Sequence, residues 1–391
     1  MEAVEHAKTE SPLRWGALSG VTAALAVFGA AQGLSYPLFT ILMQRQGMSP
    51  TLIGVSAAMM PLGLILSASL VPGAVRLFGA RNLAVGCAIA GALCFLAIGA
   101  LQNEFAWFAI RFLIGFVINP LYVLGEVWAL ALAPPSQRGR VMGVFNSLMG
   151  AGYAVGPLAL TLVGTEGWAP FLIGIAGFVS CAVVLGLVSS SLAGFEADEE
   201  PSGGFFFFMR AAPALLTAVL VSAATQQSTY SLMPVFGSSF GLAAATLAAL
   251  ITALSIGNIV LQIPLGLAAE KLGARSMIIF CAVATGTCAL LLGQFILTPF
   301  IWPLLVVMGG VGYGVYTMAL VELGNRFKGS ALVAGNAAFA LLWGLGGIVG
   351  PPSAGALMQG IGPFGLPIVI AGLTGLLVAL AIYRSARRRW A

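Results

Sequence analysis

Two charged side chains, Arg111 and Glu126, stand in the interior of the apolar run 104–132, which begins at Glu104. A charge near the middle of a membrane costs roughly 3 kcal/mol or more, so such residues usually mark the route of a substrate or an ion. A carboxyl group that is partly removed from water can exchange protons near neutral pH. We predict that Glu126 couples protons; the alternative is a structural carboxylate near the cytoplasmic end. Two roles are open for Arg111. It could bind an anionic substrate group or shift the pKa of a carboxylate, or it could tie neighbouring helices together.

The run 104–132 is long enough for one helix, and its polar residues share one side of it. At about 100° per residue, Arg111, Gly115, Asn119, Tyr122 and Glu126 fall within about 80° of each other. This stripe is predicted to face a central cavity. Because Arg111 and Glu126 are about 22 Å apart along an ideal helix, they cannot pair directly.

Uncharged polar residues at matching depths in other apolar runs are predicted to complete the cavity and to bind substrate, with polar ties between helices as the alternative. Glu322 lies near a helix end with Arg326 one turn later, so a structural ion pair is predicted there. The substrate-binding residues are predicted to be Gln32, Tyr36, Asn119, Tyr122, Gln226, Tyr230, Asn258, Gln262, Tyr313 and Tyr316.

The composition is that of a polytopic membrane protein, because 60% of the 391 residues are hydrophobic and only 7% are charged. A helix needs about 20 apolar residues to cross the hydrocarbon layer. The apolar runs predict an all-α fold with about twelve such helices. They cover residues 15–43, 50–75, 81–101, 104–132, 139–164, 168–193, 211–237, 242–269, 275–298, 301–325, 330–358 and 362–384.

The sequence holds no cluster typical of catalysis or metal binding. All five cysteines fall inside apolar runs, and the only histidine, His6, lies in the polar N-terminal segment. We therefore predict no enzyme activity, no metal site and no cofactor, with a proton gradient as the driving force. The first apolar run lacks a cleavage signature and is expected to be retained.

Basic residues gather at alternate ends of successive runs, and this pattern marks the cytoplasmic side. Both termini are then cytoplasmic, and the positive net charge faces anionic lipid headgroups instead of nucleic acid. Among the basic residues, the opposite loops hold only Arg45. The basic residues assigned to the cytoplasmic side are Lys8, Arg14, Arg76, Arg81, Arg138, Arg140, Arg210, Lys271, Arg275, Arg326, Lys328, Arg384, Arg387, Arg388 and Arg389.

Similar residues recur at an offset of 194 positions along the chain, which indicates two homologous halves. Gln32 and Tyr36 are repeated as Gln226 and Tyr230, and Tyr122 is repeated as Tyr316. Two such halves place a substrate site at their interface near the membrane midplane. The predicted divisions are a cytoplasmic tail at 1–14, six-helix halves at 15–193 and 211–385, a cytoplasmic linker at 194–210 and a tail at 386–391.

The loop after the eighth run contains Gly266, Glu270, Lys271, Gly273 and Arg275, and the loop after the second run contains Arg76, Gly79 and Arg81. These motifs resemble those of the major facilitator superfamily, over essentially the full length, and the chain most resembles bacterial YcaD-like and drug-efflux members. The first loop resembles the family's cytoplasmic signature, whereas the second has Arg76 where the family usually has Asp. Arg111 and Gly115 resemble the family's intramembrane arginine motif. The residues predicted to serve conformational change are Gly79, Arg81, Gly152, Gly156, Pro157, Gly266, Glu270, Lys271, Gly273 and Arg275.

The segment from Gly143 to Pro157 resembles the antiporter motif of proton-driven exporters, although Leu160 and Thr161 replace its usual trailing glycine pair. The resemblance implies a secondary active transporter of the bacterial inner membrane that works by alternating access as a monomer. We predict proton-coupled efflux of a small organic solute, with lipids and protons as further partners. The alternative is uptake or exchange of a small organic anion by symport, with Arg111 and Arg45 as carboxylate contacts.

Overall fold

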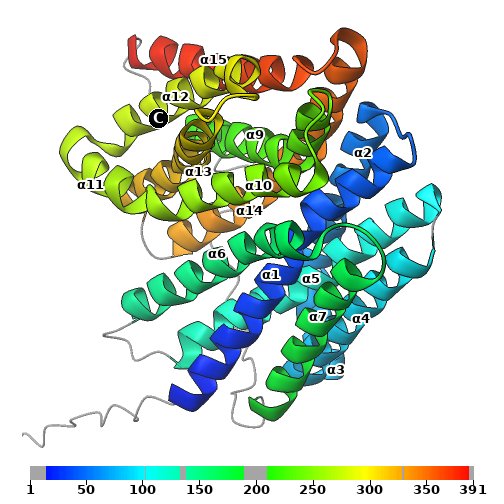
Figure 1. Ribbon diagram of the computed structural model, residues 1–391. Helices are drawn as coiled ribbons and strands as arrows, with labels where there is room; N and C mark the ends of the chain where they lie inside the picture. Colours follow the sequence, from blue (N-terminus) through cyan, green and yellow to red (C-terminus); the bar gives the residue numbers. More distant parts are fainter. Residues whose placement is uncertain (1–14, 102, 133–137, 189–208, 328–329, 387–391) are drawn as a thin grey trace, which may run out of the picture.

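The computed structural model of the chain describes residues 15–101, 103–132, 138–188, 209–327 and 330–386. The predicted tails at 1–14 and 386–391 and the predicted linker at 194–210 lie wholly or mostly outside these ranges. Within them the regular elements are all helices, as the sequence predicts (Figure 1).

The first half begins with a long helix, α1 (Trp15–Arg45), and the second begins with its counterpart, α9 (Pro213–Ser238). The other helices of the first half are α2 (Pro50–Ala68), α3 (Val71–Phe78), α4 (Ala80–Ala100), α5 (Glu104–Leu132), α6 (Arg138–Val163) and α7 (Ala169–Val188). Those of the second half are α10 (Ala244–Val260), α11 (Gln262–Leu272), α12 (Ala274–Phe295), α13 (Ile301–Arg326), α14 (Ser330–Ile361) and α15 (Gly365–Ala386).

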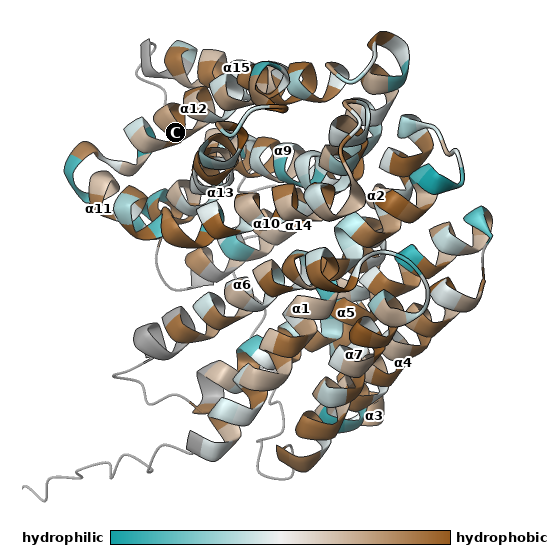
Figure 2. Cartoon of the chain, viewed as in Figure 1, coloured by the Kyte–Doolittle hydropathy of each residue, from teal (hydrophilic) through white to brown (hydrophobic). Residues whose placement is uncertain are grey.

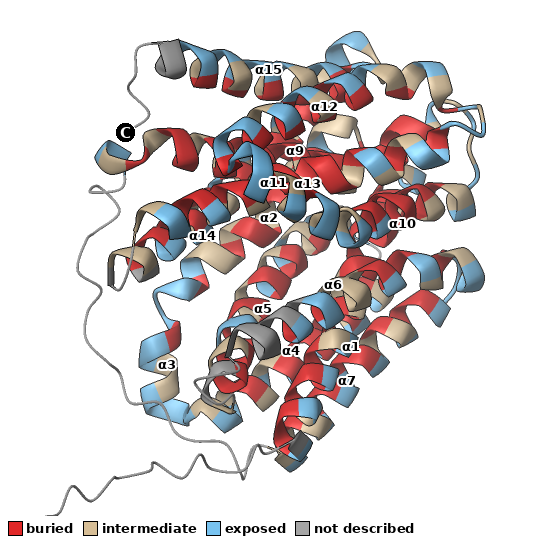
Figure 3. Cartoon of the chain, turned by 90° about the vertical axis from the view of Figure 1, so that its left-hand side faces the viewer, coloured by how far each residue is buried: buried red, intermediate tan, exposed pale blue. Residues whose placement is uncertain are grey.

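Nine of the described helices are long and apolar enough to cross a membrane, and α10 with α11 provides a tenth span. With the long helices α6 and α9, the described helices are roughly consistent with the predicted count of about twelve. Hydrophobic residues run along the helices, while hydrophilic residues gather near many of their ends (Figure 2). Buried residues line the faces where helices meet (Figure 3).

Two predicted spans are broken in the structure. The run 50–75 divides into α2 and α3, and the run 242–269 divides into α10 and α11, which are bent by 43°. Pro72 and Pro264 lie just after the two breaks. Proline has no backbone N–H to donate to the preceding turn, so each break falls where a helical hydrogen bond would be lost.

The 194-residue repeat reappears in backbone packing. A Cβ atom on Gly115 would meet the carbonyl oxygen of Met60, and one on Gly309 would meet that of Leu254, the equivalent pair in the second half. Gly152 likewise packs on Ala26 O, and its counterpart Gly346 packs on Leu220 O. Glycine is required at these places because only a residue without a side chain lets two helix backbones approach so closely.

An approximate two-fold axis runs between the halves. Tyr36 and Tyr230 are repeat-related and have ring centroids 6.3 Å apart. Gln44 and Ser238 are also repeat-related, and Gln44 Nε2 donates a hydrogen bond to Ser238 Oγ at 2.6 Å. Two symmetry-related residues can touch only near the axis that relates them, so the axis passes through both pairs.

The described side-chain hydrogen bonds between the halves lie at one end of the bundle, and α2 also packs closely on α14. We call the end where α1 begins and α15 ends the termini end, and the opposite end, where α1 and α9 finish, the far end. The described side-chain hydrogen bonds between the halves are Tyr36 to Gln227, Thr40 to the Ser231 carbonyl and Gln44 to Ser238. From these contacts toward the termini end the ribbons of the two halves diverge (Figure 1).

Candidate functional site

Glu126 is half-buried on α5 and has no hydrogen bond or ion pair to any residue that the structure describes. It interacts electrostatically with Tyr122 on its own helix and with Tyr313 and Tyr316 on α13 of the other half. Arg111 and Glu126 are not paired. A carboxylate within a membrane span that has no partner among the described residues is chemically suited to bind a proton or a cation.

Arg111 is 2% exposed and packs between α5, α1 and α2. Its Nη1 atom donates to Ser56 Oγ at 3.3 Å, and its guanidinium group lies 5.4 Å from the centre of the Phe39 ring. Its Nε atom has no partner among the described residues. These contacts are those of a tie between helices, and they lie about three helical turns from Tyr122, which is 41% exposed.

Three tyrosines from three helices meet at the pseudo-two-fold axis. Tyr36 of α1, Tyr153 of α6 and Tyr230 of α9 have ring centroids 6.0 to 6.3 Å apart. The Tyr36 hydroxyl also donates to Gln227 Oε1 at 3.1 Å. The sequence predicts Tyr36 and Tyr230 but misses Tyr153 and Gln227. The repeat gives no signal for Tyr153, because its counterpart is Gly347.

The repeat-related amides Gln32 and Gln226 are each incompletely hydrogen-bonded. Gln32 Nε2 lies 3.9 Å from Met60 Sδ, a weak acceptor, and Gln32 Oε1 has no described partner. Gln226 Nε2 also has none. Buried amide groups normally have partners, so water or a bound solute is expected to satisfy them.

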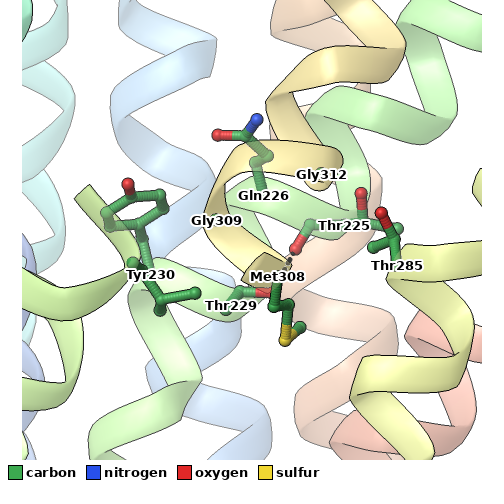
Figure 4. A pocket seen from close by; sticks show the side chains of 9 residues that line it. Thr225, Gln226, Thr229, Tyr230, Thr285, Met308, Gly309 and Gly312 are labelled. Carbon is green, nitrogen blue, oxygen red and sulfur yellow. Dashed lines mark hydrogen bonds between the residues drawn. The ribbon is translucent and has the colours of Figure 1, made fainter. Parts of the chain in front are cut away.

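Gln226 borders a small cavity inside the second half (Figure 4). Its volume is about 20 Å³, which fits one ordered water molecule, and its lining is polar enough to hold one. Three of the lining residues have different equivalents in the first half: Ala31, Gly91 and Ile118 stand where the second half has Thr225, Thr285 and Gly312. The cavity is lined by Thr225, Gln226, Thr229, Tyr230, Leu254, Thr285, Met308, Gly309 and Gly312.

Asn258 and Gln262 stand at the break between α10 and α11. Gln262 Nε2 donates to Gly310 O at 3.2 Å, and Thr317 Oγ1 donates to Gln262 Oε1 at 2.8 Å. Gln262 Nε2 also lies 3.4 Å from Asn258 Oδ1. These hydrogen bonds fasten the broken helix to α13. Asn119, predicted to face the cavity, is buried on α5 with Nδ2 unpartnered.

Four aromatic side chains form what we call the aromatic cluster: Tyr313 and Tyr316 of α13 with Phe339 and Trp343 of α14. The centroids of Tyr316 and Trp343 are 4.8 Å apart at an interplanar angle of 65°. Tyr313 lies 5.5 Å from Tyr316 and 5.9 Å from Trp343. The sequence predicts the two tyrosines but misses Trp343, because nothing in the local pattern shows that α14 brings it to α13.

At the termini end, Glu322 is paired differently from the prediction. Its Oε1 atom lies 2.7 Å from Nε of Arg275, and no ion pair to Arg326 is found in the described part of the chain. The partner comes from the start of α12, which sequence spacing along α13 cannot reveal. In the first half the equivalent of Arg275 is Arg81, which donates to Gly186 O at 2.8 Å, and Trp128 takes the place of the glutamate.

The other residues predicted to serve conformational change lie in turns between helices, on α11 and on α6. Gly79 and Gly273 have φ angles of 77° and 82° where the chain turns between helices, a backbone region that favours glycine. Gly266, Glu270 and Lys271 lie on α11, where the two charged side chains are exposed. Gly152, Gly156 and Pro157 lie on α6, and both glycines pack directly on the α1 backbone.

A family profile described as Major Facilitator Superfamily matches residues 21–249 and 215–391. The chain belongs to this superfamily. Its members are membrane transporters, so this protein is a multi-pass membrane transporter and not an enzyme. The resemblance stated from the sequence motifs is confirmed.

Relatives of similar length carry the same classification. The MFS-type transporter YfkF of Bacillus subtilis (strain 168) is 24% identical over 345 residues, covering 86% of this chain and 87% of the relative. YcaD of Escherichia coli O45:K1 is 24% identical over 298 residues, covering 74% of this chain and 73% of the relative.

Solved transporter structures share the fold. The nucleoside transporter NupG aligns with a TM-score of 0.76 at 15% identity and covers 95% of this chain and 98% of its own. The D-xylose-proton symporter aligns with a TM-score of 0.70 at 14% identity, covering 95% and 97%. At these identities the likeness shows the fold alone, so the solutes named for those transporters do not transfer.

Proposed function

We propose that this protein exports a small organic solute across the bacterial inner membrane in exchange for protons. The observation that carries the proposal is Glu126, a half-buried carboxylate within a membrane span that has no hydrogen bond or ion pair to any described residue. A group in that position can be reached from one side of the membrane at a time as the halves rock. The glycine motif on α6, which resembles that of exporters, supports the outward direction.

We also propose how the protein is oriented in the membrane and which conformational state the structure represents. Positive charge at alternate loops supports a cytoplasmic termini end. The hydrogen bonds between the halves gather at the far end, which supports a state closed toward the periplasm. Gln32 and Gln226, with their unpartnered amide atoms, are proposed to contact the solute between the halves.

The alternative, uptake of a small organic anion, receives less support. Arg111 is tied to Ser56 and covered by Phe39. Arg45 lies at the far end, where it donates to Thr165 O at 3.0 Å and lies 3.7 Å from Glu166. Both candidate carboxylate contacts are therefore already engaged with other groups.

The test has two stages. A thermal-shift screen of purified protein against drugs, amino acids, carboxylates and sugars first finds a solute, because a ligand that binds the folded state stabilises it. Proteoliposomes then compare Glu126→Gln with the unaltered protein. The variant is expected to lose accumulation driven by a proton gradient and to retain counterflow exchange. Equal loss of both activities would show a binding or folding role for Glu126 and overturn the proposal.

A further inference from the structure

The short helix α11 and the start of α12 carry balanced charges at the termini end of the second half. Glu270 and Lys271 are neighbours on α11, and both are exposed. Arg275, at the start of α12, lies with its Nε atom 2.7 Å from Glu322 Oε1. The two basic side chains of this region are therefore matched by two carboxylates.

The first half lacks this balance at the end of α3 and the start of α4. The equivalent positions, 194 residues earlier, are occupied by Arg76, Leu77, Arg81 and Trp128, so the only charges there are positive. Both carboxylates of the second half are thus missing. Arg76 and Arg81 are exposed, and neither forms an ion pair with a residue that the structure describes. Their charge remains available to an anion from outside the described chain.

The polar side chains at these positions can only donate hydrogen bonds. Arg81 donates to the Gly186 carbonyl at 2.8 Å, whereas Arg76 has no hydrogen bond to the described part of the chain. Trp128 is buried, and its Nε1 atom has no partner among the described residues. Guanidinium and indole groups have no acceptor atom. A phosphate group, with several acceptor oxygens and a negative charge, complements such a set.

The helix α3 presents apolar side chains next to these arginines. Leu77 is 75% exposed and Phe78 is 56% exposed. Figure 3 shows α3 at the outer edge of the bundle, with most of its residues exposed. In a protein that spans a membrane, such a surface near the ends of the spans lies where headgroups meet acyl chains. Apolar side chains there contact the acyl chains, and an arginine beside them reaches the headgroups.

We propose that α3 and the start of α4 bind an anionic phospholipid, with Arg76 and Arg81 on the phosphate of its headgroup and Leu77 and Phe78 against its acyl chains. A free phosphate ion would leave the apolar side chains uncovered, so the combination of groups fits a lipid. The balanced charges on α11 and α12 give the second half no equivalent site. The inference concerns the outer surface of the protein and does not depend on which solute is transported or how transport is driven.

The experiment titrates the purified full chain in detergent with dioleoylphosphatidylglycerol and, separately, with dioleoylphosphatidylcholine, and counts the bound lipids by native mass spectrometry. The first phosphatidylglycerol is expected to bind more tightly than the first phosphatidylcholine. Arg76→Ala should weaken phosphatidylglycerol binding by about fivefold, the effect expected for one basic side chain beside an anionic headgroup, and leave phosphatidylcholine binding unchanged. Arg76→Glu, which places there the residue type of the second half, should weaken it further. Leu77→Ser should weaken both lipids equally.

Lys271→Ala on α11 is the matched control, because it removes an exposed basic side chain from the equivalent part of the second half. It should keep the preference for phosphatidylglycerol; each variant is first shown to be folded by its thermal transition. A preference that persists in folded Arg76→Glu, or that falls as much in Lys271→Ala as in Arg76→Ala, would overturn the site. Inorganic phosphate is added as a competitor, and displacement of the lipid by an equal concentration of phosphate would overturn the assignment to a lipid.

Discussion

Gln44 and Ser238 occupy equivalent positions in the two halves of the chain, and Gln44 Nε2 donates a hydrogen bond of 2.6 Å to Ser238 Oγ. The contact lies near the pseudo-two-fold axis at the far end. The other described side-chain hydrogen bonds between the halves join Tyr36 to Gln227 and Thr40 to the Ser231 carbonyl, and they lie at the same end. The far end must separate for a solute to cross, so these bonds help set the balance between conformations.

Gln44→Ala is expected to favour the state that is open at the far end. One lost hydrogen bond is worth about 1 kcal/mol, which corresponds to about a fivefold change in the equilibrium. Spin labels at the exposed Gln46 and Ser239 report the separation of the halves by pulsed electron resonance. Ser19→Ala is the control, because the Ser19 hydroxyl bonds only to Gly16 O within α1. Distance distributions that do not change in Gln44→Ala would contradict the assignment.

Arg275→Ala is expected to reduce the free energy of unfolding by about 1–3 kcal/mol, because it leaves the carboxylate of Glu322 buried without its partner. Glu322 is 7% exposed. Thermal unfolding in detergent provides the measurement. Arg326→Ala should change stability far less. If Arg326→Ala were the more destabilising of the two, Arg326 would be the partner of Glu322, as sequence spacing predicts. Adding Glu322→Gln to Arg275→Ala should recover part of the loss.

Gly309→Ala is expected to destabilise the second half by about 1–3 kcal/mol, because its new methyl group would collide with the carbonyl oxygen of Leu254. Gly115→Ala should act in the same way through Met60 in the first half. Gly86→Ala is the matched control, since no atom lies within 4 Å of the added carbon. The yield of monodisperse protein and its unfolding temperature distinguish the variants. A stable Gly309→Ala protein would show that α10 and α13 can move apart.

Gly312→Ala tests whether the small cavity holds water. An added Cβ atom would meet Thr285 at 3.8 Å, an ordinary contact, so the variant should fold normally. The new methyl group occupies space in a cavity of about 20 Å³ and should exclude the water. A high-resolution density map of the unaltered protein should show the water beside Gln226 and Thr285, and the map of the variant should lack it. A dry cavity in the unaltered protein would refute the assignment.

Local sequence properties were enough to predict the spans and the repeat. The predicted run 104–132 is the helix α5 residue for residue, because hydrocarbon requires long uninterrupted helices that leave a strong signal in composition. The breaks before α3 and α11 were missed, although Pro72 and Pro264 were visible. Proline lowers the stability of a continuous helix, but whether the chain bends there depends on the helices that pack around it.

Which polar residues approach one another was decided by tertiary structure. The sequence by itself determined the membrane class, the two halves and the candidate residues Glu126 and Arg111, because a charge inside an apolar run is visible without any partner. Only the fold decided that Arg111 is covered by Phe39, that Arg275 pairs with Glu322 and that Trp343 joins Tyr316. These contacts join helices far apart in the chain, and helical periodicity gives the direction of a side chain on its own helix without naming the neighbour it meets.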